Sequence, residues 1–173
     1  NAKLVVESLN SDKVIFLPDE FLAQNIANQT DVKIISWKGR CEVHERFTAK
    51  EILAYKEQHE NIVVLAHPEC SPEVIEVSDF TGSTAGMNNY VKDNQPEKVI
   101  MVTECSMSDN VAIENPNVEF VRPCNLCPHM KRITLKKIYD ALRFDQHEVT
   151  VDDQIIDKAR LSIDRMLEIG RQK

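Results

Sequence analysis

The sequence predicts an α/β protein with short parallel sheets, built from two similar units. Five short runs rich in Val and Ile are almost continuously apolar, which is typical of strands buried on both faces of a parallel sheet. Segments with helical periodicity alternate with these runs. A repeat within the chain is the third observation, because strands, a cysteine and a helix start recur in the same order.

The predicted strands and helices alternate along most of the chain. We expect strands at residues 13–19, 32–37, 61–67, 98–104 and 118–123, and helices at 21–29, 48–58, 134–143 and 152–170. Thr48 and Glu51 have the spacing of a capping box, which indicates where the second helix begins. In the last helix Ile155, Ala159, Ile163 and Met166 share one face, so this helix is amphipathic.

The repeat pairs "KVIFLPD" at residue 13 with "KVIMVTE" at residue 98, and "FTAKEI" at 47 with "ITLKKI" at 133. Cys41 and Cys127 occupy the same place in the two copies, since 127 − 41 = 86. We therefore divide the chain into an α/β unit at 1–86 and a second at 87–173, the latter including the C-terminal helix.

Composition excludes several classes of protein. The 21 Lys and Arg against 28 Asp and Glu give a net charge of −7, without the basic stripe expected of a nucleic-acid-binding protein. The apolar runs are too short to cross a membrane. The sequence shows no signal peptide, so we expect a cytoplasmic protein. Because disulfides are rare in the cytoplasm, we expect the five cysteines to be thiols or metal ligands rather than disulfide partners.

Cys41 is the first candidate ligand. A lone cysteine after a strand is more often a small buried side chain than a ligand. Its recurrence as Cys127, just beyond the carboxyl end of a strand in each copy, favours chemistry, because open α/β sheets place their sites at this edge. Cys70 and Cys105 fall outside the repeat, and we expect structural roles for them.

The "CNLC" stretch at 124–127 leaves several alternatives open. Its spacing suits half a zinc site, a redox pair or part of an iron–sulfur site. A full zinc site would need a second pair of ligands, and the sequence has no second C-x-x-C. We expect Cys127 to be the ligand and leave the role of Cys124 undecided.

Other polar residues also follow predicted strands. His67 and Glu69 are two apart and point the same way in extended chain, where a histidine and a carboxylate can move protons; a turn on the surface is the simpler interpretation. His44, three residues after Cys41, strengthens the functional one. Ser83 and Thr84 open a predicted helix, which suits either a bound phosphate or carboxylate or an ordinary N-cap.

Together these motifs resemble the quinolinate synthase family, the iron–sulfur enzymes of de novo NAD biosynthesis. The resemblance rests on "GRCEVHERFT", "HPEC" followed by "DFTGSTAGM", "TE" after a strand, and "CPHMKRITLKKIYDAL", and it runs in order through essentially the whole chain.

The resemblance implies two three-layer αβα units of an incomplete pseudo-threefold triplication, in which each unit gives one cysteine to a [4Fe–4S] cluster. It implies that Cys41 and Cys127 are two of the cluster ligands. Glu69, His44 and His67 match residues that line the family's active site and are the expected catalytic groups. His67, Glu69, Ser83 and Thr84 are the expected substrate-binding residues.

The implied reaction condenses iminoaspartate with dihydroxyacetone phosphate to quinolinate, releasing phosphate and water, with the cluster as Lewis acid. Expected partners are these two substrates and the enzyme that supplies iminoaspartate, with no nucleic acid and no membrane. The family's first domain and its cysteine have no counterpart in this sequence. We therefore expect the isolated chain to be inactive and to hold at most a labile cluster.

Two other classes of function compete with this interpretation. A non-catalytic duplicated α/β module with a CNLC metal or redox site would need Cys124 and Cys127 together but not Cys41. A sugar- or nucleotide-binding α/β protein without metal would need none of the cysteines. The synthase needs Cys41 and Cys127 together.

Overall fold

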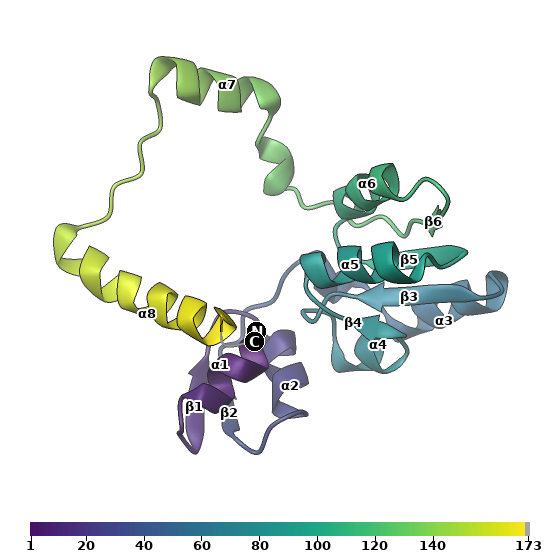
Figure 1. The fold of residues 1–173 in the computed structure, drawn as a ribbon, viewed down its shortest axis with the longest axis horizontal. Coiled ribbons are helices and arrows are strands. Elements are labelled where there is room, and N and C mark those ends of the chain that lie inside the picture. The colour runs from purple at the N-terminus through teal and green to yellow at the C-terminus, as the bar shows by residue number, and fades with distance from the viewer. Residues whose placement is uncertain (172–173) are drawn as a thin grey trace.

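The computed structural model describes residues 1–171 and shows short parallel sheets whose strands are connected through helices (Figure 1). The predicted α/β class is thereby confirmed. Residues 1–171 form one sheet of two strands and one of four. Over residues 1–171, every helix is too short or too polar to span a bilayer.

The two-stranded sheet is formed by the first part of the chain. Its elements are α1 (Ala2–Ser8), β1 (Lys13–Phe16), α2 (Glu20–Ala27) and β2 (Lys33–Ser36). The strands are parallel, and α2 packs against β2. Burial alternates along both strands, and Ile15 and Trp37 are 73% and 64% exposed. Burial on both faces was therefore a wrong expectation for these two strands, because residues 1–171 provide no layer over their second face.

The four-stranded sheet has the order β4–β3–β5–β6, all parallel. Its strands are β3 (Ile62–Ala66), β4 (Phe80–Thr81), β5 (Lys98–Val102) and β6 (Glu119–Val121). β3 and β5 are the central pair and are almost wholly buried, as the apolar runs predict. This sheet joins strands from both sides of residue 86. The repeat and the sheets therefore divide the chain differently, and the division into 1–86 and 87–173 stays a prediction about the repeat.

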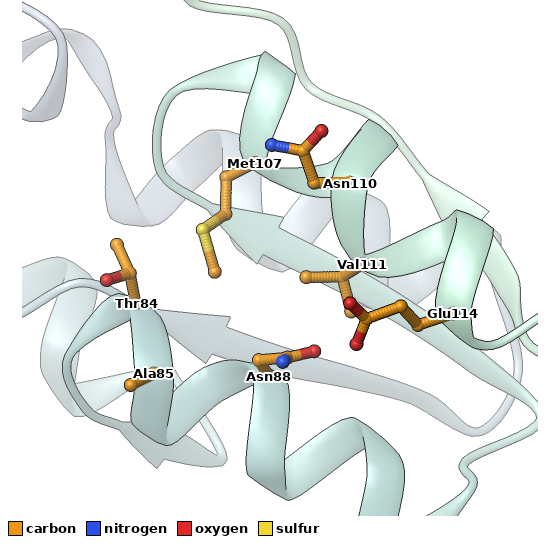
Figure 2. Close-up of a pocket in the computed structure, with 7 residues that line it drawn as sticks. All are labelled: Thr84, Ala85, Asn88, Met107, Asn110, Val111 and Glu114. Carbon is orange, nitrogen blue, oxygen red and sulfur yellow. The ribbon is translucent and has the colours of Figure 1, made fainter.

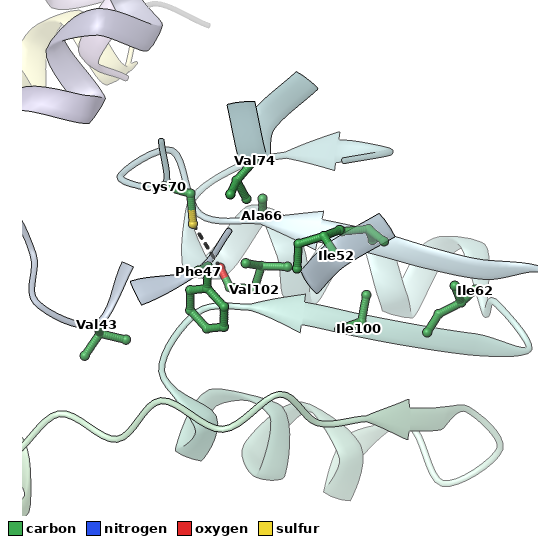
Figure 3. Close-up of a cluster of buried hydrophobic side chains, with 10 residues drawn as sticks. Val43, Phe47, Ile52, Ile62, Ala66, Cys70, Val74, Ile100 and Val102 are labelled. Carbon is green, nitrogen blue, oxygen red and sulfur yellow. Dashed lines mark hydrogen bonds between the residues drawn. The ribbon is translucent and has the colours of Figure 1, made fainter. Parts of the chain in front are cut away.

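Helices cover both faces of the four-stranded sheet. They are α3 (Ala49–Gln58) and α4 (Pro72–Glu76) on one face, and α5 (Thr84–Asn94) and α6 (Cys105–Glu114) on the other. Alternate residues of each central strand enter the two cores. Val64 and Ile100 pack with Ile52 of α3, as Figure 3 shows for Ile100 and Ile52. Leu65 and Met101, the next residues along, pack with α5 and α6. The helices and this sheet together form three layers in the order α, β, α.

The last two helices leave this body. α7 (Leu135–Phe144) follows the short helix η2 (Met130–Arg132) and stands away from both sheets, and α8 (Asp153–Arg171) returns to pack on α1 (Figure 1). The amphipathic pattern predicted for α8 is present, but Ile155 and Ile163 are 55% and 53% exposed. On α7, Leu135 and Leu142 are 83% and 81% exposed. Both helices thus carry apolar faces that the described residues leave uncovered.

Candidate metal centre and active site

The predicted site residues gather where strands end. Because the strands of each sheet are parallel, their carboxyl ends lie at one edge, and polar side chains that follow them meet there. These residues lie in the segments that follow four strands: Cys41 and His44 after β2, His67 and Glu69 after β3, Ser83 and Thr84 after β4, and Cys127 after β6.

Cys41 sits in a loop fixed by a buried carboxylate. Asp19, at the end of β1, is 4% exposed. Its Oδ1 accepts a hydrogen bond of 2.8 Å from the Leu22 N–H and caps α2, and its Oδ2 accepts one of 2.9 Å from the Cys41 N–H. One side chain therefore ties the start of α2 to the candidate ligand, 22 residues further along.

The chain then turns sharply after Cys41. The Glu45 N–H donates to the Cys41 carbonyl at 3.0 Å, and the short helix η1 (His44–Arg46) follows. Thr48 and Glu51 form the predicted capping box at the start of α3. The turn brings the His44 ring back toward the four-stranded sheet, where it is 7% exposed.

The loop at Cys127 repeats this local structure. The Lys131 N–H donates to the Cys127 carbonyl at 3.1 Å, η2 follows, and Thr134 caps α7 as Thr48 caps α3. In addition, the Met130 N–H donates to the Cys127 Sγ at 3.5 Å. The repeat found in the sequence is therefore also a repeat of backbone conformation around the two cysteines.

The two cysteine loops lie close to one another. Cys41 and Cys127 are both half-buried and pack against the same apolar core. Between the loops, His129 Nε2 lies 3.5 Å from Glu42 Oε1, an oxygen that is buried and has no hydrogen-bond partner among the described residues. The fold thus places both cysteines that the repeat singled out against one apolar core.

His44, His67 and Glu69 form one cluster, as their positions after strands predicted. His44 Nδ1 lies 3.1 Å from Glu69 Oε2, and the His44 and His67 rings stack with centroids 4.4 Å apart and planes 9° from parallel. On the other side of its ring, His44 Nε2 lies 3.0 Å from the Thr103 Oγ1. The His67 Nδ1 accepts a hydrogen bond from the Glu69 N–H at 3.4 Å. Both histidines are therefore held in fixed orientations.

This packing shifts the protonation of the cluster. Burial, with a smaller contribution from the neighbouring His44, lowers the pKa of His67 to about 4. The hydrogen bond with His44 lowers the pKa of the Glu69 carboxyl, against the opposing effect of burial. At neutral pH the cluster therefore presents a neutral His67 ring beside an ionised Glu69, which can accept a proton.

Cys41, His44 and Glu69 can also hold a metal. One possible ligand atom from each lies within 4.8 Å of the other two. Beside them, a cavity of about 280 Å³ is lined by residues that include Asp19, Trp37, Arg40, Cys41 and Glu69. A thiolate, an imidazole and a carboxylate around one open cavity are a donor set suited to iron or zinc.

Ser83 and Thr84 open α5 next to this cluster. The Gly82 N–H donates to the Ala66 carbonyl at 3.2 Å, so both residues follow β4 directly beside the end of β3. Ser83 is the N-cap, and its Oγ accepts from the Gly86 N–H at 3.1 Å. Thr84 stands at one end of a second cavity, of about 270 Å³, between α5 and α6 (Figure 2). Ser83 is therefore an ordinary N-cap in this structure. Thr84 is exposed to solvent.

One expectation about the cysteines was wrong. Cys105 and Cys124 form a disulfide with Cα atoms 5.1 Å apart, whereas Cys41, Cys70 and Cys127 are free. The disulfide joins the start of α6 to the loop after β6, because β5 and β6 are neighbours in the sheet. Cys124 therefore does not pair with Cys127. Cys70 is structural, as predicted: it is fully buried, donates to the Val102 carbonyl (Figure 3), and burial raises the pKa of its thiol to about 12.

Two polar residues at the site received no role from the sequence, namely Asp19 and Thr103, although Thr103 belongs to the "TE" motif of the resemblance. Both follow the first strand of a repeat copy, in "FLPD" and "MVTE", and both are nearly inaccessible, at 4% and 3% exposure. Their position at a strand's carboxyl end was the available signal, but their partners lie 22 and 59 residues away in the chain.

Comparison with known sequences agrees with this geometry. A sequence profile of the family described as "Quinolinate synthetase A protein" matches residues 1–168. The chain belongs to the quinolinate synthetase A family. Similar curated proteins include "Quinolinate synthase" of Sinorhizobium fredii, 60% identical over 169 residues, and "Quinolinate synthase 2" of Mesorhizobium japonicum, 58% identical over 169 residues.

The matched relatives are longer than this chain. The two alignments cover 98% of the chain but 47% of the Sinorhizobium protein and 52% of the Mesorhizobium protein. "Quinolinate synthase" of Caulobacter vibrioides is 55% identical over 173 residues, again 98% of the chain and 47% of the relative. The chain thus spans about half the length of the curated relatives it matches.

Proposed function

We propose that this chain supplies two cysteine ligands and an acid–base cluster to a quinolinate synthase. The proposed reaction condenses iminoaspartate with dihydroxyacetone phosphate and releases quinolinate, phosphate and two waters. The observation that carries the proposal is the matched setting of Cys41 and Cys127, two free thiols in the same backbone turn of a repeat, within a family of that name.

The residues present fit a [4Fe–4S] cluster. Cys41 and Cys127 would be its ligands from this chain, and the third would come from outside it. The Met130 N–H that donates to the Cys127 Sγ is the kind of hydrogen bond that stabilises cluster sulfurs. The Cys105–Cys124 disulfide removes Cys124 as a competing ligand, which favours the synthase over the CNLC module. When bound, the cluster would supply an open iron that acts as a Lewis acid toward substrate oxygens.

The proton transfers fall to the acid–base cluster. Ring closure to quinolinate loses water and shifts protons, so it needs a group that is deprotonated at neutral pH to accept a proton, and a donor nearby. Glu69 is ionised and faces the cavity next to Cys41. His44 holds it from one side, and the neutral His67 stacks on His44. We assign Glu69 as the base and the two histidines as the groups that bind and orient substrate.

Substrate anions would bind at the start of α5. Ser83 and Thr84 stand at the positive end of an 11-residue helix, beside the end of β3, and both are exposed. The Thr84 hydroxyl is free of hydrogen bonds within the described residues, so it can donate to a carboxylate or phosphate oxygen. The Ser83 Oγ already accepts from Gly86 and can still donate its own proton.

The rest of the enzyme would cover the uncovered apolar faces. Ile15 in β1, Trp37 just after β2, and Leu135 and Leu142 of α7 are exposed, and matched relatives are about twice as long as this chain. Burial of these side chains by the other half would close the cavity at Cys41. We accordingly propose that the chain alone is inactive, and that the complete enzyme works in the cytoplasm.

A chimera tests this proposal. The aligned half of the Sinorhizobium fredii relative, 60% identical, is replaced by this chain, and quinolinate formation from the two substrates is measured anaerobically. The proposal predicts an active chimera, an inactive isolated chain, and a loss of about 10²–10⁴-fold in kcat for Glu69→Gln. A chimera that folds and carries iron but makes no quinolinate would refute it.

A further inference from the structure

We propose that Asn25 is a positioning residue: from within α2, its side-chain amide holds the turn that carries Glu69 at a fixed place relative to Cys41. Neither the sequence motifs nor the comparisons give Asn25 a role. The effect of Asn25 on the reaction rests on the function proposed above, but its contacts do not.

Asn25 holds the chain on both sides of Glu69. Its Nδ2 lies 2.8 Å from the Pro68 carbonyl oxygen and 2.9 Å from the Cys70 carbonyl oxygen. A backbone carbonyl can only accept, so it is the NH₂ group that faces the two oxygens, and it donates one hydrogen to each. Glu69 lies between the two residues that accept these bonds, so its backbone is fixed from both directions.

These hydrogen bonds join two parts of the fold that are distant in sequence. Asn25 belongs to α2, which packs on the two-stranded sheet, whereas Pro68 and Cys70 follow β3 of the four-stranded sheet and lie 43 and 45 residues further along. Asn25 is 5% exposed. Because water has little access here, removal of the amide would leave both carbonyls without a replacement partner, which is costly.

The other backbone bonds of this turn stay within the four-stranded part. The His67 N–H donates to the Val102 carbonyl at 3.2 Å, and the His67 carbonyl accepts from the Cys70 N–H at 2.9 Å. The Glu69 N–H donates to the His67 Nδ1 at 3.4 Å. These bonds shape the turn and attach it to β5, whereas the bonds from Asn25 attach it to α2.

The same helix also holds the loop of the candidate metal ligand. Asp19 caps α2, and its Oδ2 accepts from the Cys41 N–H at 2.9 Å. Asn25 follows 25 − 19 = 6 positions later, about 9 Å along the helix axis. Since a helical turn is stiff, α2 acts as a spacer that sets Glu69 relative to Cys41, and possible ligand atoms of these two residues lie within 4.8 Å of one another.

The consequence for the reaction is accurate placement of the base. Substrate in the cavity beside Cys41 must come within hydrogen-bond reach of the Glu69 carboxylate for a proton to move. A displacement of about 1 Å at such a site can slow a reaction by about 10²-fold. Without the amide of Asn25, the turn keeps its own bonds but loses its attachment to α2, so Glu69 is placed less accurately.

The first test is hydrogen exchange of the asparagine side-chain amides in this chain. Asn25 is compared with Asn28, an exposed asparagine at the end of the same helix, and each pair of NH₂ signals is assigned by its loss in Asn25→Ala or Asn28→Ala. Both hydrogens of Asn25 should exchange more slowly than those of Asn28 by about tenfold or more, because both are bonded and buried. Equal exchange rates would overturn the proposal.

The backbone amides of the turn provide a second readout on the same samples. The Glu69 and Cys70 amide signals should shift in Asn25→Ala, while Asn28→Ala should leave them in place. Unchanged turn signals in Asn25→Ala would show that the amide does not hold the turn, and would refute the proposal even if the Asn25 hydrogens exchange slowly.

Activity in the chimera tests the effect on the reaction, at a temperature where circular dichroism shows every variant folded. Asn25→Ala should lower kcat by about tenfold to 10²-fold, with KM and iron content little changed. The matched control is Ile26→Ala, which weakens the packing of α2 at the adjacent buried residue and leaves the amide intact, so its kcat should stay within about twofold.

The outcomes separate this proposal from the proposed function. An active chimera whose kcat is unaffected by Asn25→Ala, or is lowered equally by Ile26→Ala, would refute the positioning role. An inactive wild-type chimera would refute the proposed function, and the amide measurements would still decide whether Asn25 holds the turn at Glu69.

Discussion

Asp19 allows the account of the Cys41 loop to be tested by stability alone. Its two oxygens accept hydrogen bonds of 2.8 Å from Leu22 and 2.9 Å from Cys41, and the side chain is buried. Asp19→Ala leaves both N–H groups without their partner. A lost N-cap costs about 1 kcal/mol and a lost hydrogen bond to a charged group about 1.5–3 kcal/mol, so we expect about 2.5–4 kcal/mol in total.

Asp19→Asn separates the two contributions. Asparagine is an equally good N-cap, so its oxygen can keep the bond from Leu22, but its NH₂ group then faces the Cys41 N–H and cannot accept from it. This variant should lose about 1.5–3 kcal/mol. The control is Asp31→Ala, an exposed aspartate whose replacement should stay within about 0.5 kcal/mol.

Urea unfolding followed by circular dichroism measures these differences, and amide exchange of Cys41 reports the local effect. The Cys41 amide should exchange faster in both Asp19 variants. A cost for Asp19→Ala no larger than that of Asp31→Ala, or an unchanged Cys41 amide, would refute the view that Asp19 fixes the cysteine loop.

Three further predictions follow from the described contacts. In chain purified without reductant, three cysteines should react with a thiol reagent under denaturing conditions and five after reduction, because Cys105 and Cys124 are joined; five reactive thiols at the outset would contradict the disulfide. Folding lowers the pKa of His67 from 6.5 to about 4, so the folded state resists protonation of this ring. The free energy of unfolding should therefore be full above pH 6.5 and fall as the pH drops toward 4, and His67→Gln should flatten this fall. An unchanged pH profile in the variant would exclude His67 as its source. Ile52→Ala, at a fully buried position in α3, should lose about 2–5 kcal/mol, whereas Leu53→Ala, with its side chain 45% exposed, should lose far less; equal losses would contradict the observed burial.

The sequence predicted the class of fold because its signals were local. All five apolar runs are strands, and the repeat correctly paired the turns at Cys41 and Cys127. The two-residue strand β4 and the five-residue helix α4 were too short to give a periodic pattern. The local sequence could not predict the exposure of Ile15 and Trp37 either, because exposure depends on which layers surround a strand.

The site was predicted as a set of residues but not as a network. Places after strands pointed to five of the site residues, and the fold brings these to one region: Cys41, His44, His67, Glu69 and Cys127. The contacts of Asp19 and Thr103 were not predicted, because hydrogen bonds across 22 and 59 residues depend on packing and leave no pattern of spacing. For the same reason spacing associated Cys124 with Cys127, whereas neighbouring strands join it to Cys105.

The central claim is that Cys41 and Cys127 ligate an iron–sulfur cluster. The most direct test is the content of iron and acid-labile sulfide in the anaerobically reconstituted chimera, compared with Cys41→Ser and with Cys70→Ala as the matched control at a buried cysteine. We predict about four irons per polypeptide in the chimera and in Cys70→Ala, and a loss of most iron in Cys41→Ser. Retention of the full iron content by Cys41→Ser would contradict the account.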